Sequence, residues 1–164
     1  MKVINNFLSQ NVFDNIKNLL EDSRFPYYYQ SSFLPSISKN NNCDFFFCHT
    51  FFRDSKQTSE DVFVKNILYP ITNKLKVKKI IRAKVNLYTN QHKHIESDYH
   101  VDTDDNVNIA LFSVGNNNGW TEFKTGKKFL SKENSIALFN SKLKHKVVTQ
   151  TNTKRRININ INYE

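Results

Sequence analysis

The final extended segment of the chain, RINININ at residues 156–162, constrains the possible folds more than any other feature of the sequence. Successive side chains on a strand point to opposite faces, so this segment has two different sides. One side carries Ile157, Ile159 and Ile161, and the other carries Arg156, Asn158, Asn160 and Asn162. The pattern predicts a strand whose isoleucines pack against helices while its arginine and asparagines point into the interior of a barrel.

From Lys79 onward the sequence reads as short strands separated by turns, and two amphipathic helices precede this region. The predicted strands are IIRAKVNLY, DYHVD, VNIALFSV, TEFK, KKFL, SIALFN, KHKVVTQ and RRINININ. The first helix is predicted over SQNVFDNIKNLLEDS, and the second begins at TSED and is ended or kinked by Pro70. The run CDFFFCHTFF between them has the composition of a buried strand. This order predicts an α+β protein whose later part is a β-sandwich or barrel of the jelly-roll type.

A chain of 164 residues is long enough for a single domain with its own core and too short for two. We expect residues 1–78 to supply N-terminal helices with flanking strands, and residues 79–163 to form the β-core. Cys43 and Cys48 should face opposite sides of their strand and stay reduced. Because the sequence has no run of about 18 apolar residues and no signal-like N-terminus, we expect a soluble cytoplasmic protein with no membrane partner, in the host cytoplasm if it is viral.

The formal net charge of +9 raises the question of a nucleic-acid partner. Lysine is abundant, but so are asparagine, isoleucine and phenylalanine, while glycine and proline are scarce; AT-rich coding produces this spectrum and explains most of the charge. The densest basic stretch, KLKVKKIIRAK at residues 74–84, is interpreted as the solvated side of a helix end and a strand. We therefore expect a protein or small-molecule substrate in preference to nucleic acid.

His100 and Asp102, in the segment DYHVDTDD, are the strongest candidates for metal ligands. A non-haem Fe(II) site needs two neutral imidazoles and one carboxylate on one face of the metal, which leaves further positions open. On a strand, residues i and i+2 project to the same side, so an HxD pair presents two ligands to one ion. The third ligand must come from a distant strand, and His145 is the only histidine downstream. Structural zinc is disfavoured because it usually takes four ligands, often thiolates, and both cysteines lie far upstream.

A rival pair, His94 and Glu96, has similar spacing. It follows the IIRAKVNLY strand so closely that we expect it in a loop. The preferred residues also have ordinary explanations, namely a loop hydrogen bond for the HxD pair and solvent exposure for His145. Their joint occurrence in this order and strand parity favours the metal site.

Arg156 faces the barrel interior in this arrangement, whereas Arg155 has the opposite parity and should lie outside. A guanidinium inside a barrel needs an anion, and its planar shape suits a carboxylate held by two hydrogen bonds. The ordinary alternative for Arg156 is a surface ion pair, which contributes little to stability.

These motifs occur in the order HxD, NGWTEF, ALFNSKLKH and RxN, which resembles the 2-oxoglutarate and Fe(II)-dependent oxygenases, especially the short prolyl-4-hydroxylase-like forms encoded by phages. The resemblance covers roughly residues 79 to 163, and the opening VINNFLS with the first helix is similar to the N-terminal lead of that group. It implies a double-stranded β-helix, a cupin-like jelly roll, with the N-terminal helices packed on one sheet.

The resemblance also implies a set of ligands and a reaction. Iron would be held by His100, Asp102 and His145, and 2-oxoglutarate would chelate the iron while its distal carboxylate meets Arg156. The implied reaction is hydroxylation of an unactivated C–H bond, with Fe(II), O2 and the small-molecule cosubstrate 2-oxoglutarate.

The segment NLY is similar to an NxY motif of related dealkylation enzymes, in which Asn86 and Tyr88 would hydrogen-bond the cosubstrate, and Asn158 matches the RxN of the same enzymes. Two substrate classes follow: a prolyl or other protein side chain, or a nucleobase that is dealkylated or hydroxylated. Base recognition would need aromatic platforms such as FPYYYQ or DFFFCHTFF, which we interpret as core strands. A non-catalytic basic barrel that binds anions or nucleic acid, and a cupin-like metalloenzyme without 2-oxoglutarate, remain as alternatives.

Overall fold

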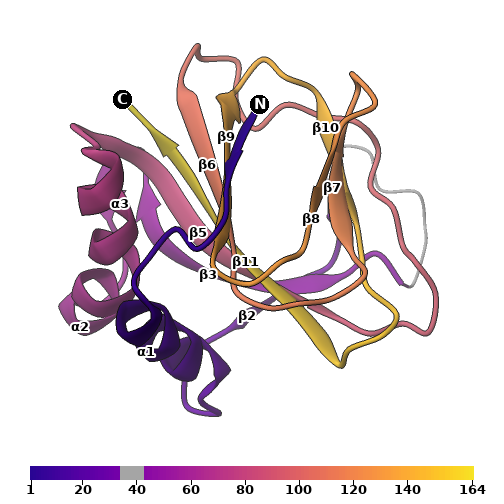
Figure 1. The fold of residues 1–164 in the computed structure, drawn as a ribbon, viewed down its shortest axis with the longest axis horizontal. Helices are drawn as coiled ribbons and strands as arrows, with labels where there is room; N and C mark the ends of the chain where they lie inside the picture. Colours follow the sequence, from indigo (N-terminus) through magenta and orange to yellow (C-terminus); the bar gives the residue numbers. More distant parts are fainter. Residues whose placement is uncertain (34–42) are drawn as a thin grey trace.

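Residues 155–163 form the middle strand of the larger sheet, β11 (Arg155–Tyr163), as their alternation predicted. The computed structural model describes residues 1–33 and 43–164 (Figure 1). The sequence also predicts a polar loop at SKNNN, residues 38–42, and this segment lies outside the described residues. β11 pairs antiparallel with β5 (Ile80–Thr89) on one side and with β6 (Asn108–Ser113) on the other.

The strands of the described residues form two antiparallel sheets. The larger sheet has eight strands in the order β1-β9-β6-β11-β5-β3-β2, with β4 beside β3. Its remaining members are β1 (Lys2–Ile4), β2 (Tyr28–Gln30), β3 (Phe46–Arg53), β4 (Lys56–Gln57) and β9 (Ser135–Asn140). The smaller sheet has three strands, β7 (Trp120–Phe123), β8 (Lys128–Leu130) and β10 (His145–Val148). This arrangement is that of a β-sandwich with short helices, as the order of elements predicted.

Helices cover one face of the larger sheet, and the smaller sheet lies on the opposite side (Figure 1). The first helix is α1 (Gln10–Glu21), whose buried residues include Phe13 and Ile16. These two side chains belong to the same apolar cluster as Ile157, Ile159 and Ile161 of β11. The prediction that the isoleucines pack against the N-terminal helices is therefore confirmed, and the other face of β11 is directed toward the smaller sheet.

The second helical segment differs from its prediction. It consists of α2 (Asp61–Phe63), a wider π-type turn η2 (Val64–Leu68) and α3 (Tyr69–Leu75). Pro70 does not end the helix, because it lies in the first turn of α3, where a missing N–H breaks no hydrogen bond of that helix. The segment ends instead at Lys76, whose φ of 56° is left-handed.

One predicted strand is absent. The segment DYHVD forms no strand, and only a single bridge joins His100 to His145. The other seven strands predicted after Lys79 are present as β5 to β11. Sequence reasoning missed β1 and β4, because strands of two or three residues are too short to display a period of two.

The aromatic and cysteine-containing segments were only partly predicted. Phe25 is buried, but Tyr28 and Tyr29 are exposed by 61% and 60%, so FPYYYQ is not wholly a core segment. Cys43 precedes β3, which begins at Phe46, and Cys48 lies within it. Both thiols are half-buried and form no disulfide.

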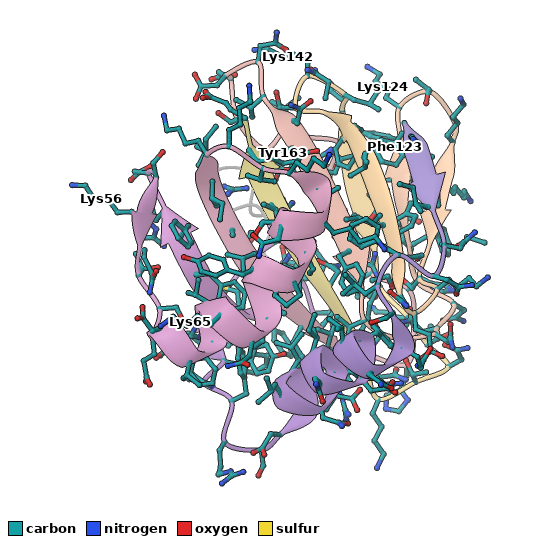
Figure 2. All side chains as sticks on the ribbon, turned by 60° about the vertical axis from the view of Figure 1, so that its left-hand side comes forward. Lys56, Lys65, Phe123, Lys124, Lys142 and Tyr163 are labelled. Atoms are coloured by element: carbon teal, nitrogen blue, oxygen red, sulfur yellow. The ribbon has the colours of Figure 1, made fainter. Side chains whose placement is uncertain are left out.

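The positive charge is spread over the surface. The labelled lysines in Figure 2, Lys56, Lys65, Lys124 and Lys142, are exposed and come from separate elements or turns. This distribution agrees with a compositional origin for most of the charge. No helix within residues 1–33 and 43–164 combines the length and apolar character that crossing a membrane requires.

The helix-facing side of β11 yields a stability prediction. Ile159 is fully buried in the main apolar cluster, so Ile159→Ala should lower the free energy of unfolding by about 2–5 kcal/mol, as truncation of a buried isoleucine does. Leu130→Ala is the control, because Leu130 is 63% exposed and should change stability by less than about 0.5 kcal/mol. Denaturant unfolding measures both, and equal midpoints for the two variants would contradict the assigned packing.

Candidate functional site

Polar side chains from β5 and β11 stand in register on the sheet face directed away from the helices. Across the two strands, Tyr88 lies opposite Arg156, Asn86 opposite Asn158, Lys84 opposite Asn160, and Arg82 opposite Asn162. We call these eight residues the inner rows. Several of them line a cavity together with Phe46 of β3, Thr121 of β7 and His145 of β10. The alternation that buries isoleucines on one face of β11 thus places a polar wall on the other.

His100, Asp102 and His145 meet in this cavity. One ligand-type atom from each residue lies within 4.8 Å of the others. The Nε2 atom of His145 is 3.6 Å from Oδ2 of Asp102, and the two imidazole centroids are 4.7 Å apart. The backbones of His100 and His145 exchange two N–H···O bonds of 2.9 Å, which fix the loop before β6 against the start of β10. Among residues 1–33 and 43–164, this is the one cluster of three histidine, cysteine or acidic residues with such geometry.

Both histidines are oriented by backbone carbonyls. His100 Nδ1 lies 3.1 Å from the carbonyl oxygen of Asp98, and His145 Nδ1 lies 3.0 Å from that of Leu143. A carbonyl accepts a hydrogen bond, so each Nδ1 carries a proton, and Nε2 is the atom of each ring that can bind a metal. Burial, reinforced by His145, lowers the pKa of His100, which favours the neutral imidazole. This is the protonation pattern that a metal-binding histidine requires.

The Asp102 carboxylate is held by residues of the inner rows. Arg82 Nη2 donates to Oδ1 at 2.9 Å, and Asn160 Nδ2 donates to Oδ2 at 3.1 Å. Burial disfavours the charged form of Asp102, but the charges of His145 and Arg82 and the hydrogen bond from Asn160 together keep its pKa below the usual value. The carboxylate is therefore ionised and fixed in orientation, as a metal ligand should be.

The rival pair lies elsewhere. His94 and Glu96 are both exposed. His94 Nδ1 bonds to the carbonyl oxygen of Thr149 at 2.5 Å, and Glu96 forms an ion pair with Lys146. Neither residue lines the cavity or belongs to the three-residue cluster. Both residues lie between β5 and β6, outside any named strand, so the expectation of a loop is confirmed apart from an isolated bridge between Glu96 and Val148.

Arg156 is 2% exposed and contacts two residues that line the cavity, Thr121 and Tyr88. Its Nε donates to Ser131 Oγ at 2.8 Å, its Nη2 donates to Thr121 Oγ1 at 3.2 Å, and its guanidinium lies 5.5 Å from the centre of the Tyr88 ring. Its Nη1 atom is buried and has no hydrogen-bond partner among the described residues. Burial lowers the pKa of Arg156 to about 10, so the group stays charged at neutral pH. A charged, buried guanidinium with no carboxylate beside it fits an anionic ligand.

Arg155 shows the contrast expected from its parity. It is exposed and pairs with Glu21 of α1, with 3.1 Å between Arg155 Nη2 and Glu21 Oε2. The two adjacent arginines therefore lie on opposite faces of β11.

Asn86, Asn158 and Tyr88 line the cavity, as expected for residues that contact a bound molecule. Asn86 Nδ2 donates to Asn158 Oδ1 at 3.0 Å, and Asn86 Oδ1 is buried without a partner among the described residues. The Tyr88 ring stacks on Phe46 with 5.6 Å between centroids. Burial raises the pKa of Tyr88 to about 12, so its hydroxyl stays protonated and able to donate.

Arg82, Lys84 and Asn160 also belong to the site, and sequence reasoning missed all three. The stretch at residues 74–84 was interpreted as solvated, which holds for Lys74, Lys76, Lys78 and Lys79 but is wrong for Lys84, which lines the cavity. The signal was present in the sequence, because residues 82 and 84 have the same parity as Asn86 and Tyr88 on one strand.

Solved structures of other proteins share this fold. A prolyl-4-hydroxylase from Pseudomonas putida aligns with a TM-score of 0.62 and 11% sequence identity, covering 99% of this chain and 91% of that chain. A second structure is a prolyl hydroxylase from Trichoplax adhaerens in complex with an oxygen degradation domain peptide fragment of hypoxia inducible factor. It aligns with a TM-score of 0.67 and 13% sequence identity, covering 99% of this chain and 82% of that chain. An oxidoreductase of the 2OG-Fe(II) oxygenase family from Burkholderia pseudomallei aligns with a TM-score of 0.60 and 11% sequence identity, covering 87% of this chain and 74% of that chain.

The sequence itself matches no protein-family model and no curated protein. At these low identities the structural likeness shows the fold alone. The architecture is thus one that 2OG-Fe(II) oxygenases and prolyl hydroxylases adopt. The chemistry of this chain must be argued from its own residues.

Proposed function

We propose that the protein is an Fe(II)- and 2-oxoglutarate-dependent dioxygenase, built on a double-stranded β-helix, that hydroxylates an unactivated C–H bond. The observation that carries the proposal is the convergence of two imidazoles and one carboxylate within 4.8 Å inside a cavity. This donor set suits non-haem Fe(II) better than structural zinc, because it supplies three ligands and no thiolate. The fold shared with 2OG-Fe(II) oxygenases supports the same conclusion.

The residues fit an iron ion in protonation state as well as in number. The Nε2 atoms of His100 and His145 and the carboxylate of Asp102 would hold the metal, while carbonyl oxygens fix both rings. Arg82 and Asn160 hold the carboxylate in place. Iron, with 2-oxoglutarate and O2, supplies the oxidising chemistry, and the protein supplies position and electrostatics.

The cosubstrate would be bound by the inner rows. Arg156 offers a charged guanidinium with one unpartnered nitrogen, suited to the distal carboxylate of 2-oxoglutarate. Thr121 and Tyr88, which contact Arg156 and line the cavity, would form the wall beside that carboxylate. The unpartnered Asn86 Oδ1 and the Asn158 side chain would complete the polar surface along the bound molecule.

We infer that the primary substrate is a prolyl or other protein side chain, or a small molecule. The Trichoplax adhaerens structure holds a peptide fragment on the same fold, which supports a protein substrate. A nucleobase remains the second candidate, because Phe33 and Phe46 line the cavity and present aromatic surface on which a base could stack.

Anaerobic addition of Fe(II) and 2-oxoglutarate tests the proposal directly. The wild-type protein should develop the weak visible charge-transfer band of an iron-bound 2-oxo acid, and succinate, which lacks the keto group, should give none. Absence of the band in a folded protein would favour either an iron-free basic barrel or a metalloenzyme that does not use 2-oxoglutarate.

A further inference from the structure

One cation in the cavity is left without a counter-ion by the proposed chemistry. Lys84 lies on the inner row of β5, between Arg82 and Asn86, and stands opposite Asn160 of β11 and Thr50 of β3. It lines the same cavity as His100 and Asp102. Its Nζ atom lies over the Phe46 ring, 5.5 Å from the centroid.

No carboxylate of the described residues forms an ion pair with Lys84, although the charge of Asp102 acts on it across the cavity. Asp102 is the only acidic residue that lines the cavity among the described residues, and it is already engaged by Arg82 and Asn160. No hydrogen bond or ion pair joins Lys84 Nζ to any residue that the structure describes. The remaining segment, LPSISKNNN at residues 34–42, contains no acidic residue. An anion in direct contact with Lys84 Nζ would therefore come from a bound molecule.

An unpaired ammonium in this position is unfavourable until an anion binds. Burial lowers the pKa of Lys84, the neighbouring charge of Arg82 acts in the same direction, and the charge of Asp102 opposes them only in part. The face of an aromatic ring is a weak partner for an ammonium compared with a carboxylate or phosphate. Long lysines usually extend toward water, so a lysine kept on a cavity wall indicates a ligand.

The cosubstrate does not account for this charge. Its distal carboxylate is assigned to Arg156, which stands opposite Tyr88. Lys84 and Tyr88 are four residues apart on β5, which corresponds to roughly 13 Å along an extended strand. Lys84 thus lies on the far side of Asn86 from the Arg156 end, close to Asp102 through their shared neighbour Asn160.

We propose that Lys84 binds an anionic group, a carboxylate or a phosphate, on the primary substrate and so selects an acidic molecule for oxidation. This inference rests on the proposed function. Lys84 would fix the end of the substrate beside Asp102, while the reacting carbon lies at the metal. The site thereby separates two anions, with Arg156 binding the cosubstrate and Lys84 binding the substrate.

The test uses full-length protein loaded with Zn(II) and 2-oxoglutarate, which cannot turn over. Acetate and inorganic phosphate serve as anionic probes, acetamide serves as the neutral counterpart of acetate, and amide chemical shifts report binding. In the wild-type protein, acetate, phosphate or both should cause saturable changes in the amide chemical shifts along β5. Acetamide should cause none. Lys84→Gln should weaken the binding of that anion by about 10- to 100-fold, as expected for loss of a charged hydrogen bond.

Lys79→Gln is the matched control, because Lys79 is exposed immediately before β5 and the charge change is the same. It should leave anion affinity within about twofold of wild type, since exposed charges are screened. Two results would overturn the inference: no saturable anion binding by the loaded wild type, or equal anion affinity in wild type and Lys84→Gln.

Calorimetric titration of 2-oxoglutarate into the Zn(II)-loaded wild type and Lys84→Gln shows whether Lys84 binds the substrate or the cosubstrate. Unchanged 2-oxoglutarate affinity in Lys84→Gln supports a substrate role. A loss comparable with the loss for acetate would assign Lys84 to the cosubstrate and overturn the inference. Failure of wild type to bind 2-oxoglutarate at all would instead contradict the proposed function, so the two failures are distinguishable.

Discussion

His145→Ala is expected to abolish tight binding of a divalent metal. His145 contributes one of the three donor atoms within 4.8 Å and is the only one that comes from β10. Loss of an outer partner of a metal ligand typically costs about 10- to 100-fold in affinity, so loss of a ligand itself should exceed about 100-fold. Titration with Co(II), whose visible absorption changes on coordination, measures the affinity directly.

The same variant should lose the stabilisation that metal binding gives. A metal that binds only the folded state adds about 2.7 kcal/mol at a free concentration 100 times its Kd. Wild-type protein should therefore unfold at higher temperature with Co(II) than with EDTA, whereas His145→Ala should show little difference. His94→Ala is the matched control, because His94 is exposed and lies outside the cluster. Co(II) affinity that is retained in His145→Ala, or lost in His94→Ala, would show that the metal site is elsewhere.

The alternation of β11 explains why so much of this site could be predicted from sequence. A period of two reports both faces of a strand at once, so the isoleucines that pack on the helices also fix where Arg156 and Asn158 point. Asn86 and Tyr88 were named through the resemblance, and the same rule accounts for their shared position on the inner face of β5. Such predictions succeed because the direction of a side chain on a strand depends on parity alone.

The candidate metal ligands were predicted with an incorrect local structure. His100 and Asp102 were expected on a strand, but DYHVD forms only the bridge to His145. Tertiary contacts hold the pair in place: the backbone bonds to His145 and the side chains of Arg82 and Asn160. Contacts between residues far apart in sequence leave no periodic signal, so sequence alone could name the ligands without showing how they are held.

Lys84 and Arg82 were missed because the basic stretch was interpreted by its density of charge. Charge density describes composition, whereas parity on β5 decides which side chains face the cavity. The four exposed lysines of that stretch lie before β5, whereas Lys84 lies on β5 and faces the inner row of β11. Pro70 is a comparable case, since its effect depends on its position within a helical turn.

Arg156→Ala should raise the Kd for 2-oxoglutarate by about 10²- to 10³-fold while leaving metal affinity nearly unchanged. Removing one partner of a buried ion pair typically costs roughly 3–5 kcal/mol, because the other charge is left without compensation. Arg156 meets this condition, since it is 2% exposed and contacts only hydroxyl groups and the Tyr88 ring among the described residues. Calorimetric titration of the Zn(II) protein with 2-oxoglutarate, paired with Co(II) titration, separates the two affinities.

Two further variants make the Arg156 prediction specific. Arg155→Ala removes an equal charge from the opposite face of β11, where Arg155 pairs with Glu21, so it should leave the Kd for 2-oxoglutarate within about twofold because exposed ion pairs contribute little. Gly119→Ala keeps the charge but would place a Cβ atom 2.9 Å from Arg156 Cδ and 3.0 Å from the Gln150 backbone nitrogen. Because that contact displaces the guanidinium without removing it, Gly119→Ala should weaken 2-oxoglutarate binding less than Arg156→Ala does. If all three variants bound 2-oxoglutarate as wild type does, the distal carboxylate of 2-oxoglutarate would be held by other residues. Arg156 would then only pack against Ser131, Thr121 and Tyr88.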